Sequence, residues 1–141
     1  MNSLSDQYPI VLTQAVLWGD MDAFDHVNNT VYFRYFEDVR IAFFDRLQIL
    51  EHKDATGIGP ILASTRCDFK LPLKYPDTVT LAGKATVTSA KKITMEYAVY
   101  SEAQQAVVAS GEGLLVYYNY NEGRSCEIPA TIASAIQDLS E

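Results

Sequence analysis

The strongest constraint in this 141-residue sequence is a run of apolar residues, most of them aromatic, that recur every three or four positions after Asn28. This spacing is the period of an α-helix with one apolar face, and polar residues such as Arg40 fill most of the gaps. Asn28, Asn29 and Thr30 each offer a side chain that caps a first helical turn. The pattern predicts a helix of about 18 residues, roughly 27 Å long, that is buried along one side. Its apolar stripe is Tyr32, Phe33, Phe36, Val39, Phe43, Phe44 and Leu47.

Beyond this helix, the residues around Gly57 and Pro60 indicate a linker, and the hydrophobic period then changes to two, which is typical of half-buried strands. The connections between the later strands are short and favour antiparallel pairing. One aromatic helix and one apolar sheet face are both buried if the sheet wraps around the helix. The sequence therefore predicts an α+β fold with a five-stranded antiparallel sheet around a central helix. We expect strands at residues 8–17, 61–69, 79–88, 93–100 and 107–120, and a short last helix at residues 129–139.

Composition narrows the class of protein. Apolar residues make up 48% of the chain and charged residues 21%, which is typical of a globular protein and, at this length, of a single domain over residues 1–141. The net charge of −7 argues against a nucleic-acid-binding protein, which usually carries a basic face. No signal peptide is apparent at the start, and no apolar run approaches the ~20 residues that span a bilayer. We expect a protein without a membrane segment.

The cysteine and histidine content argues against a metal site and a disulfide framework. Cys67 and Cys126 are far apart and form no CxxC pair, so we interpret them as reduced thiols of a cytoplasmic protein. Only two histidines are present, His26 and His52, and neither belongs to a zinc-binding motif. The sequence predicts no metal ion.

The densest polar cluster lies in a loop that leads into the long helix. The start of a helix presents unpaired backbone N–H groups and a partial positive charge, which can hold a carbonyl oxygen as it becomes negative. A carboxylate a few residues upstream is then placed to act as nucleophile or general base. These polar residues can equally well do no more than cap the helix and solvate the loop, and His26 can be a structural hydrogen-bonding residue. The cluster is Asp20, Asp22, Asp25, His26, Asn28 and Asn29.

Residues 18–37 (WGDMDAFDHVNNTVYFRYFE) closely resemble the signature of hotdog-fold acyl-CoA thioesterases. The resemblance is strongest to 4-hydroxybenzoyl-CoA thioesterase and the YbgC-like branch. The residues around Leu71–Leu73, Lys74–Asp77 and Ile128–Pro129 also match later landmarks of these proteins. The resemblance covers nearly the whole chain and implies a hotdog fold, in which an antiparallel sheet wraps around a long helix. It also implies assembly into a homodimer or homotetramer.

The resemblance assigns roles to individual residues. Asp22 matches the catalytic carboxylate, which attacks the thioester directly or activates a water. The backbone amide near Asn29 matches the group that polarises the carbonyl, and His26 matches a position that is His in many relatives. Lys91 and Lys92 match basic residues that meet the phosphates of coenzyme A across a subunit interface. The implied substrate is an acyl-CoA, so coenzyme A is part of the substrate and no separate cofactor is expected.

Three other functions are compatible with parts of this pattern. A hotdog hydratase also uses an Asp and a His, but it carries an Asp-x-Asn-Pro-x-His loop that residues 22–26 lack. An acyl-carrier-protein thioesterase has a similar loop, with an Asn at the position of Phe24. A non-catalytic acyl-CoA-binding protein would keep the fold without needing an acid at position 22.

Overall fold

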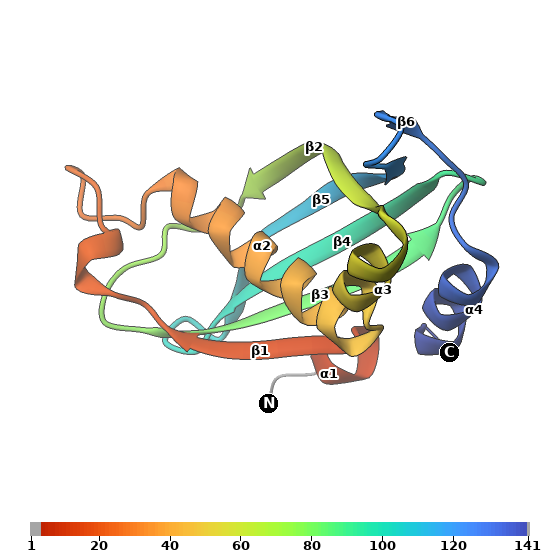
Figure 1. Ribbon diagram of the computed structural model, residues 1–141. Coiled ribbons are helices and arrows are strands. Elements are labelled where there is room, and N and C mark those ends of the chain that lie inside the picture. Colours follow the sequence, from red (N-terminus) through yellow and green to blue (C-terminus); the bar gives the residue numbers. More distant parts are fainter. Residues whose placement is uncertain (1–3, 141) are drawn as a thin grey trace.

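The computed structural model describes residues 4–140, in which one long helix lies against one face of a curled antiparallel sheet (Figure 1). The expected α+β architecture is thus confirmed. The helices are α1 (Leu4–Gln7), the 3-10 helix η1 (Trp18–Asp20), α2 (Asn29–Arg46), α3 (Ile49–Thr56) and α4 (Ala130–Leu139). The strands are β1 (Ile10–Ala15), β2 (Ile58–Phe69), β3 (Thr78–Val87), β4 (Lys92–Ser101), β5 (Ala106–Asn119) and β6 (Arg124–Ser125).

Helix α2 is the predicted aromatic helix and has 18 residues. Asn28 is its N-cap, because the Asn28 side chain accepts the backbone N–H of Thr30 at 3.0 Å. Tyr35, Phe36 and Phe43 are each only 1% exposed, so the aromatic stripe forms the centre of the core. This burial is the main stabilisation of the helix, since propensity alone is weak for a sequence rich in aromatic residues.

The sheet has the strand order β1-β3-β4-β5-β2, with the short β6 paired to the last residues of β5, and every pair is antiparallel. The prediction of five strands is corrected to six by β6, whose two residues are too short for a periodic pattern. Strand β2 pairs with β5 rather than with its successor β3. The chain therefore has to cross from one side of the sheet to the other between these two strands.

The crossing segment, residues 70–77, is held against the loop that precedes α2. Its Leu73 carbonyl accepts the backbone N–H of Val27 at 2.8 Å, and the Leu73 side chain is fully buried. The Pro72 carbonyl accepts the side-chain amide of Gln104 at 2.8 Å. The hydrogen bond between Val27 and Leu73 ties the polar loop to the crossing segment. The crossing also brings the end of β2 beside the start of α2.

Between α2 and β2 the structure corrects the predicted linker. Gln48 adopts a left-handed backbone with φ of 55°, which ends the path of α2 and lets a second helix, α3, begin at Ile49. Helix α3 ends at Gly57, whose φ of 77° suits glycine at a helix C-terminus. Strand β2 starts directly afterwards at Ile58, three residues earlier than expected, and includes Pro60. No helix within residues 4–140 is long and apolar enough to cross a membrane.

Candidate active site

The loop between η1 and α2 is closed on itself around Asp22. The backbone N–H of Asp22 donates to the His26 carbonyl at 2.7 Å. In return, Asp22 Oδ1 accepts the backbone N–H groups of Phe24 at 2.8 Å and His26 at 3.3 Å. These contacts occupy one carboxylate oxygen only, and Oδ2 has no hydrogen-bond partner among residues 4–140. The loop thus holds the carboxylate by one oxygen and leaves the other without a partner in the described part of the chain.

Asp20, the other acid of the Asp-x-Asp pair, has a partner for both carboxylate oxygens and for its carbonyl. Its side chain is 8% exposed, and Oδ1 lies 3.0 Å from Arg34 Nη2. Oδ2 accepts the backbone N–H of Leu17 at 3.2 Å, and the Asp20 carbonyl accepts that of Asn28 at 2.9 Å. Asp20 therefore positions the loop against the helix, which leaves Asp22 as the acid that is able to act on a ligand.

The start of α2 supplies an open hydrogen-bond donor next to Asp22. Asn28 accepts two backbone N–H groups of the first helical turn. Its side-chain Oδ1 accepts that of Thr30 and its carbonyl accepts that of Val31, each at 3.0 Å. The backbone N–H of Asn29 has no acceptor among the described residues. It lies in the first turn, where the helix dipole adds partial positive charge. This amide is suited to bind a carbonyl oxygen.

These groups meet in a hollow of about 390 Å³ at the N-terminal end of α2. The structure brings together all three residues that the sequence predicted here, because Asp22, His26 and Asn29 line the same hollow. His26 is half-buried, and its ring nitrogens have no hydrogen-bond partner among residues 4–140. The imidazole is therefore available to a ligand.

Tyr32, Phe69 and Lys70 also line this hollow. The rings of Tyr32 and Phe69 meet edge to face with centroids 5.0 Å apart and form an apolar wall. Burial raises the pKa of Tyr32 to about 12, with a smaller contribution from Cys67, so its hydroxyl stays neutral. Tyr32 belongs to the predicted aromatic stripe. The sequence does not single out Phe69 and Lys70, because nothing in it shows that β2 ends beside α2.

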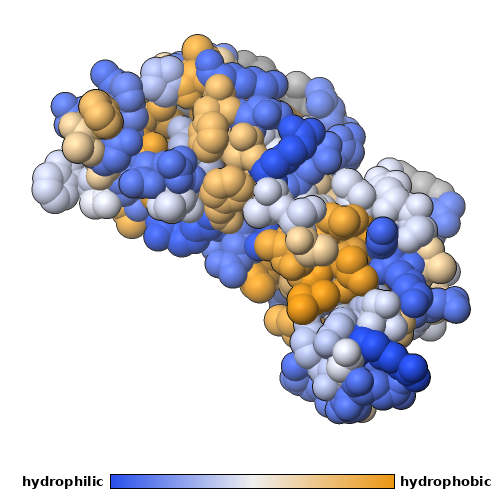
Figure 2. All heavy atoms as spheres, turned by 90° about the horizontal axis from the view of Figure 1, so that it is seen from above, coloured by the Kyte–Doolittle hydropathy of each residue, from blue (hydrophilic) through white to orange (hydrophobic). Residues whose placement is uncertain are grey.

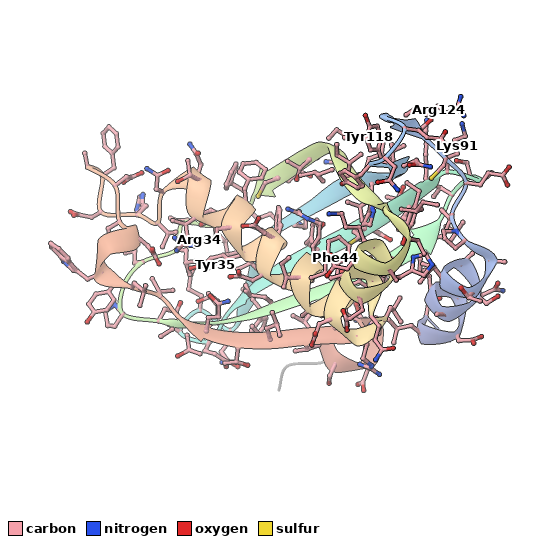
Figure 3. The ribbon with its side chains drawn as sticks, in the orientation of Figure 1. Arg34, Tyr35, Phe44, Lys91, Tyr118 and Arg124 are labelled. Carbon is pink, nitrogen blue, oxygen red and sulfur yellow. The ribbon has the colours of Figure 1, made fainter. Side chains whose placement is uncertain are left out.

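Lys91 and Lys92 lie at the opposite end of the sheet from Asp22. Lys92 begins β4, whose last residue, Ser101, is at the end nearer the polar loop, and ten residues of strand span roughly 30 Å. Figure 3 shows Lys91 beside Arg124, far from the part of α2 that carries Arg34. Lys91 Nζ lies 3.3 Å from Ser125 Oγ. Within one chain, the structure does not bring the two lysines to the Asp22 hollow.

The model of the thioesterase-like superfamily matches residues 16–136 of this chain, which include the loop, α2 and strands β2 to β6 but not β1. The PA2801 protein of Pseudomonas aeruginosa is 30% identical, with a TM-score of 0.80 over 92% of this chain and 99% of that one. A thioesterase of Thermus thermophilus, solved with coenzyme A and zinc, is 25% identical, with a TM-score of 0.83 over 96% of both chains. YsmA of Bacillus subtilis is 28% identical over 83 residues, 59% of this chain but only 55% of YsmA.

The chain belongs to the thioesterase-like superfamily and has its hotdog fold, a curled antiparallel sheet around a long central helix. This family defines a class of thioester hydrolases. Among residues 4–140, no three His, Cys, Asp or Glu side chains are grouped to hold a metal ion.

Proposed function

We propose that the protein hydrolyses the thioester of an acyl-CoA, with Asp22 as the catalytic carboxylate. One observation supports this most directly. Asp22 has an unoccupied Oδ2, and the unpaired backbone N–H of Asn29 lines the same hollow. A negatively charged oxygen and a helix-start N–H are the two groups that attack on a carbonyl requires, one for the carbon and one for the oxygen.

In the proposed reaction the thioester oxygen accepts the Asn29 N–H, which stabilises the negative charge that develops there. Asp22 then acts in one of two ways. Its Oδ2 attacks the carbonyl carbon, the C–S bond breaks, coenzyme A leaves as the thiol after taking up a proton, and water hydrolyses the resulting mixed anhydride. Alternatively, Asp22 takes a proton from a water molecule that attacks the same carbon. His26 lies beside this centre and orients the substrate or donates a proton to the sulfur.

Coenzyme A binding is proposed to need more than one subunit. Lys91 and Lys92 carry local positive charge suited to phosphates but lie too far from Asp22 in the same chain. They can serve the site of a neighbouring subunit in a homodimer or homotetramer. The β2 edge is open to such pairing: Ile61 and Leu62 are 42% and 38% exposed, and Figure 2 shows a hydrophobic patch on this side of the molecule. We include in the proposal a cytoplasmic location and the 4-hydroxybenzoyl-CoA/YbgC-like branch.

The test is release of free thiol from short, medium, long and aromatic acyl-CoAs. We expect hydrolysis of at least one of them, and an Asp22→Asn variant that is slower by at least ~100-fold in kcat with KM nearly unchanged. Asp25→Asn is the matched control. Asp25 is exposed in the same loop and has a φ of 60°, which Asn tolerates.

Two results would contradict the proposal. A folded Asp22→Asn variant with the wild-type rate would remove Asp22 from the chemistry. No thiol release from any acyl-CoA by folded wild-type protein would favour an acyl-carrier-protein substrate. If acyl-carrier-protein thioesters were also stable, with acyl-CoA still bound, the protein would be a non-catalytic binder.

A further inference from the structure

Arg40, in the middle of α2, is a buried cation without a carboxylate partner. Its side chain is 9% exposed, yet no Asp or Glu oxygen among residues 4–140 lies within 4.0 Å of it. Arg34, Arg66 and Arg124, which are all more exposed, each pair with a carboxylate. A buried guanidinium is costly unless an acceptor compensates it, so Arg40 is a candidate anion-binding residue.

Within residues 4–140, the one side chain that Arg40 hydrogen-bonds is Tyr97 of β4. Arg40 Nη1 donates to the Tyr97 hydroxyl at 3.2 Å, and its guanidinium carbon lies 6.0 Å from the centre of that ring. Burial raises the pKa of Tyr97, so the hydroxyl stays neutral and does not cancel the positive charge. The hydroxyl hydrogen has no acceptor among the described residues. Arg40 and Tyr97 together thus present several unused donors at one point.

The fold makes room for this pair. A Cβ atom at position 113 would lie 2.8 Å from the Tyr97 hydroxyl, so the Gly at this position on β5 leaves the space that the hydroxyl occupies. On its other side, the Tyr97 ring stacks on Phe36 of α2, with centroids 4.5 Å apart and planes 10° apart. The stacking and the adjacent glycine therefore hold the hydroxyl in place.

The α2-facing side of β2 leads from the Asp22 hollow to this pair. We define the β2 strip as Thr65, Cys67 and Phe69. Thr65 and Cys67 lie opposite Gly113 and Gly111, so they share the sheet face of these glycines, and Phe36 of α2 fills the space above Gly111. Phe69 is part of the wall of the hollow, and Thr65 is level with the Tyr97 hydroxyl.

Helix α2 covers the β2 strip only in part. Phe69 is 52% exposed, Thr65 is also exposed and Cys67 is half-buried. From Phe69 to Thr65 the strand advances about 13 Å. An extended acyl chain advances about 1.2 Å per bond, so about ten bonds span this distance. The β2 strip is mostly apolar, as an acyl chain requires, and ends at a cation.

We propose that Arg40 and Tyr97 select acyl groups of medium length that end in a carboxylate. This inference rests on the proposed hydrolysis at Asp22. The acyl chain would lie along the β2 strip, and its terminal carboxylate would accept hydrogen bonds from the Arg40 guanidinium and the Tyr97 hydroxyl. A guanidinium is suited to two parallel bonds with a carboxylate, which gives selectivity over a methyl end of the same length.

The experiment compares decanedioyl-CoA, esterified at one end only, with decanoyl-CoA. For the wild type we expect kcat/KM to favour the carboxylate-ended substrate by about 10- to 100-fold, the size of a charge-assisted hydrogen bond. Arg40→Gln should remove this preference by lowering kcat/KM for decanedioyl-CoA alone. Tyr97→Phe should reduce it in part. Arg46→Gln, an exposed Arg on the same helix, should leave it unchanged.

Each alternative outcome is distinct. Thiol release from both substrates without a preference in the wild type overturns this inference and leaves the proposed hydrolysis intact. An Arg40→Gln variant that keeps the preference but loses its oligomeric state shows that a second copy of the chain supplies the acceptor, and also overturns it. No release from these substrates or from the acyl-CoA panel contradicts the proposed function itself. Because the wild-type preference is measured first, the test does not depend on Arg40→Gln folding.

Discussion

Asp22 and His26 are joined by two hydrogen bonds that close the five-residue turn 22–26, one to the backbone and one to the side chain of Asp22. The Asp22 N–H donates to the His26 carbonyl at 2.7 Å, and Asp22 Oδ1 accepts the His26 N–H at 3.3 Å. Neither contact uses the imidazole ring. The geometry of the loop is therefore independent of the side chain at position 26, whereas it depends on an oxygen acceptor at position 22.

This dependence predicts different stabilities for two variants of Asp22. Asp22→Asn keeps an amide oxygen that accepts the N–H groups of Phe24 and His26, so the loop should survive. Asp22→Ala removes both bonds and should cost a further ~1–2 kcal/mol, at about 1 kcal/mol for each hydrogen bond. The measurement is urea unfolding of the wild type and both variants. Equal midpoints for Asn and Ala would show that the side-chain bonds do not stabilise the loop.

The two lysines at the far end of the sheet give a second prediction. If Lys91 and Lys92 meet coenzyme A phosphates, replacing both with Ala should raise KM for acyl-CoA by ~10-fold or more. A truncated acyl-pantetheine, which lacks the nucleotide, should keep its KM. Lys84→Ala is the control, because Lys84 lies in the middle of β3, 3.9 Å from Glu96. An equal effect on both substrates would reject phosphate binding.

Sequence periodicity predicted α2 and most of the strands because each has a regular apolar face. It missed α3, since a left-handed residue at Gln48 is not a pattern that a sequence displays. Arg40 fills a gap in the apolar stripe as any polar residue would, and only the packing of α2 against Tyr97 of the sheet shows that it is buried. Likewise, the distance from Lys91 to Asp22 depends on strand order, which short connections do not specify.

A third prediction concerns the close approach of α2 to β5. A Cβ atom at Gly111 would overlap the Arg66 carbonyl and lie 2.5 Å from Phe36. Both obstacles are fixed, one by backbone and one by core packing. We expect Gly111→Ala to lower the free energy of unfolding by about 1–3 kcal/mol.

The matched control is Gly19→Ala, where a Cβ atom meets nothing within 4 Å. Chemical denaturation of both variants checks the prediction. If the two lost equal stability, or if Gly111→Ala lost none, the helix would be able to move away from the sheet more easily than its packing indicates.

The last prediction follows from buried phenols and a thiol. Burial is the main cause that raises the pKa of Tyr32 and Tyr117 to about 12, from an ordinary value of 10.0, and that of Cys67 to about 11, from 9.0. The folded state thus keeps these protons at pH values where the unfolded chain has released them. The associated stability is fully present below about pH 9 and is lost as the pH rises towards 12. The urea concentration at the unfolding midpoint, measured in a series of buffers from pH 7 upwards, should decrease once the pH exceeds about 9.

Tyr117 offers the sharpest variant for this measurement. Its hydroxyl is buried and has no hydrogen-bond partner among residues 4–140, so its removal leaves no polar group unpaired. Tyr117→Phe should match or exceed wild-type stability at neutral pH by up to ~1 kcal/mol. It should also show a shallower decline at high pH, because one of the raised pKa values is gone. Tyr118→Phe, on the opposite face of β5, is the control, and an equally shallow decline in that variant would contradict burial of Tyr117 as the cause.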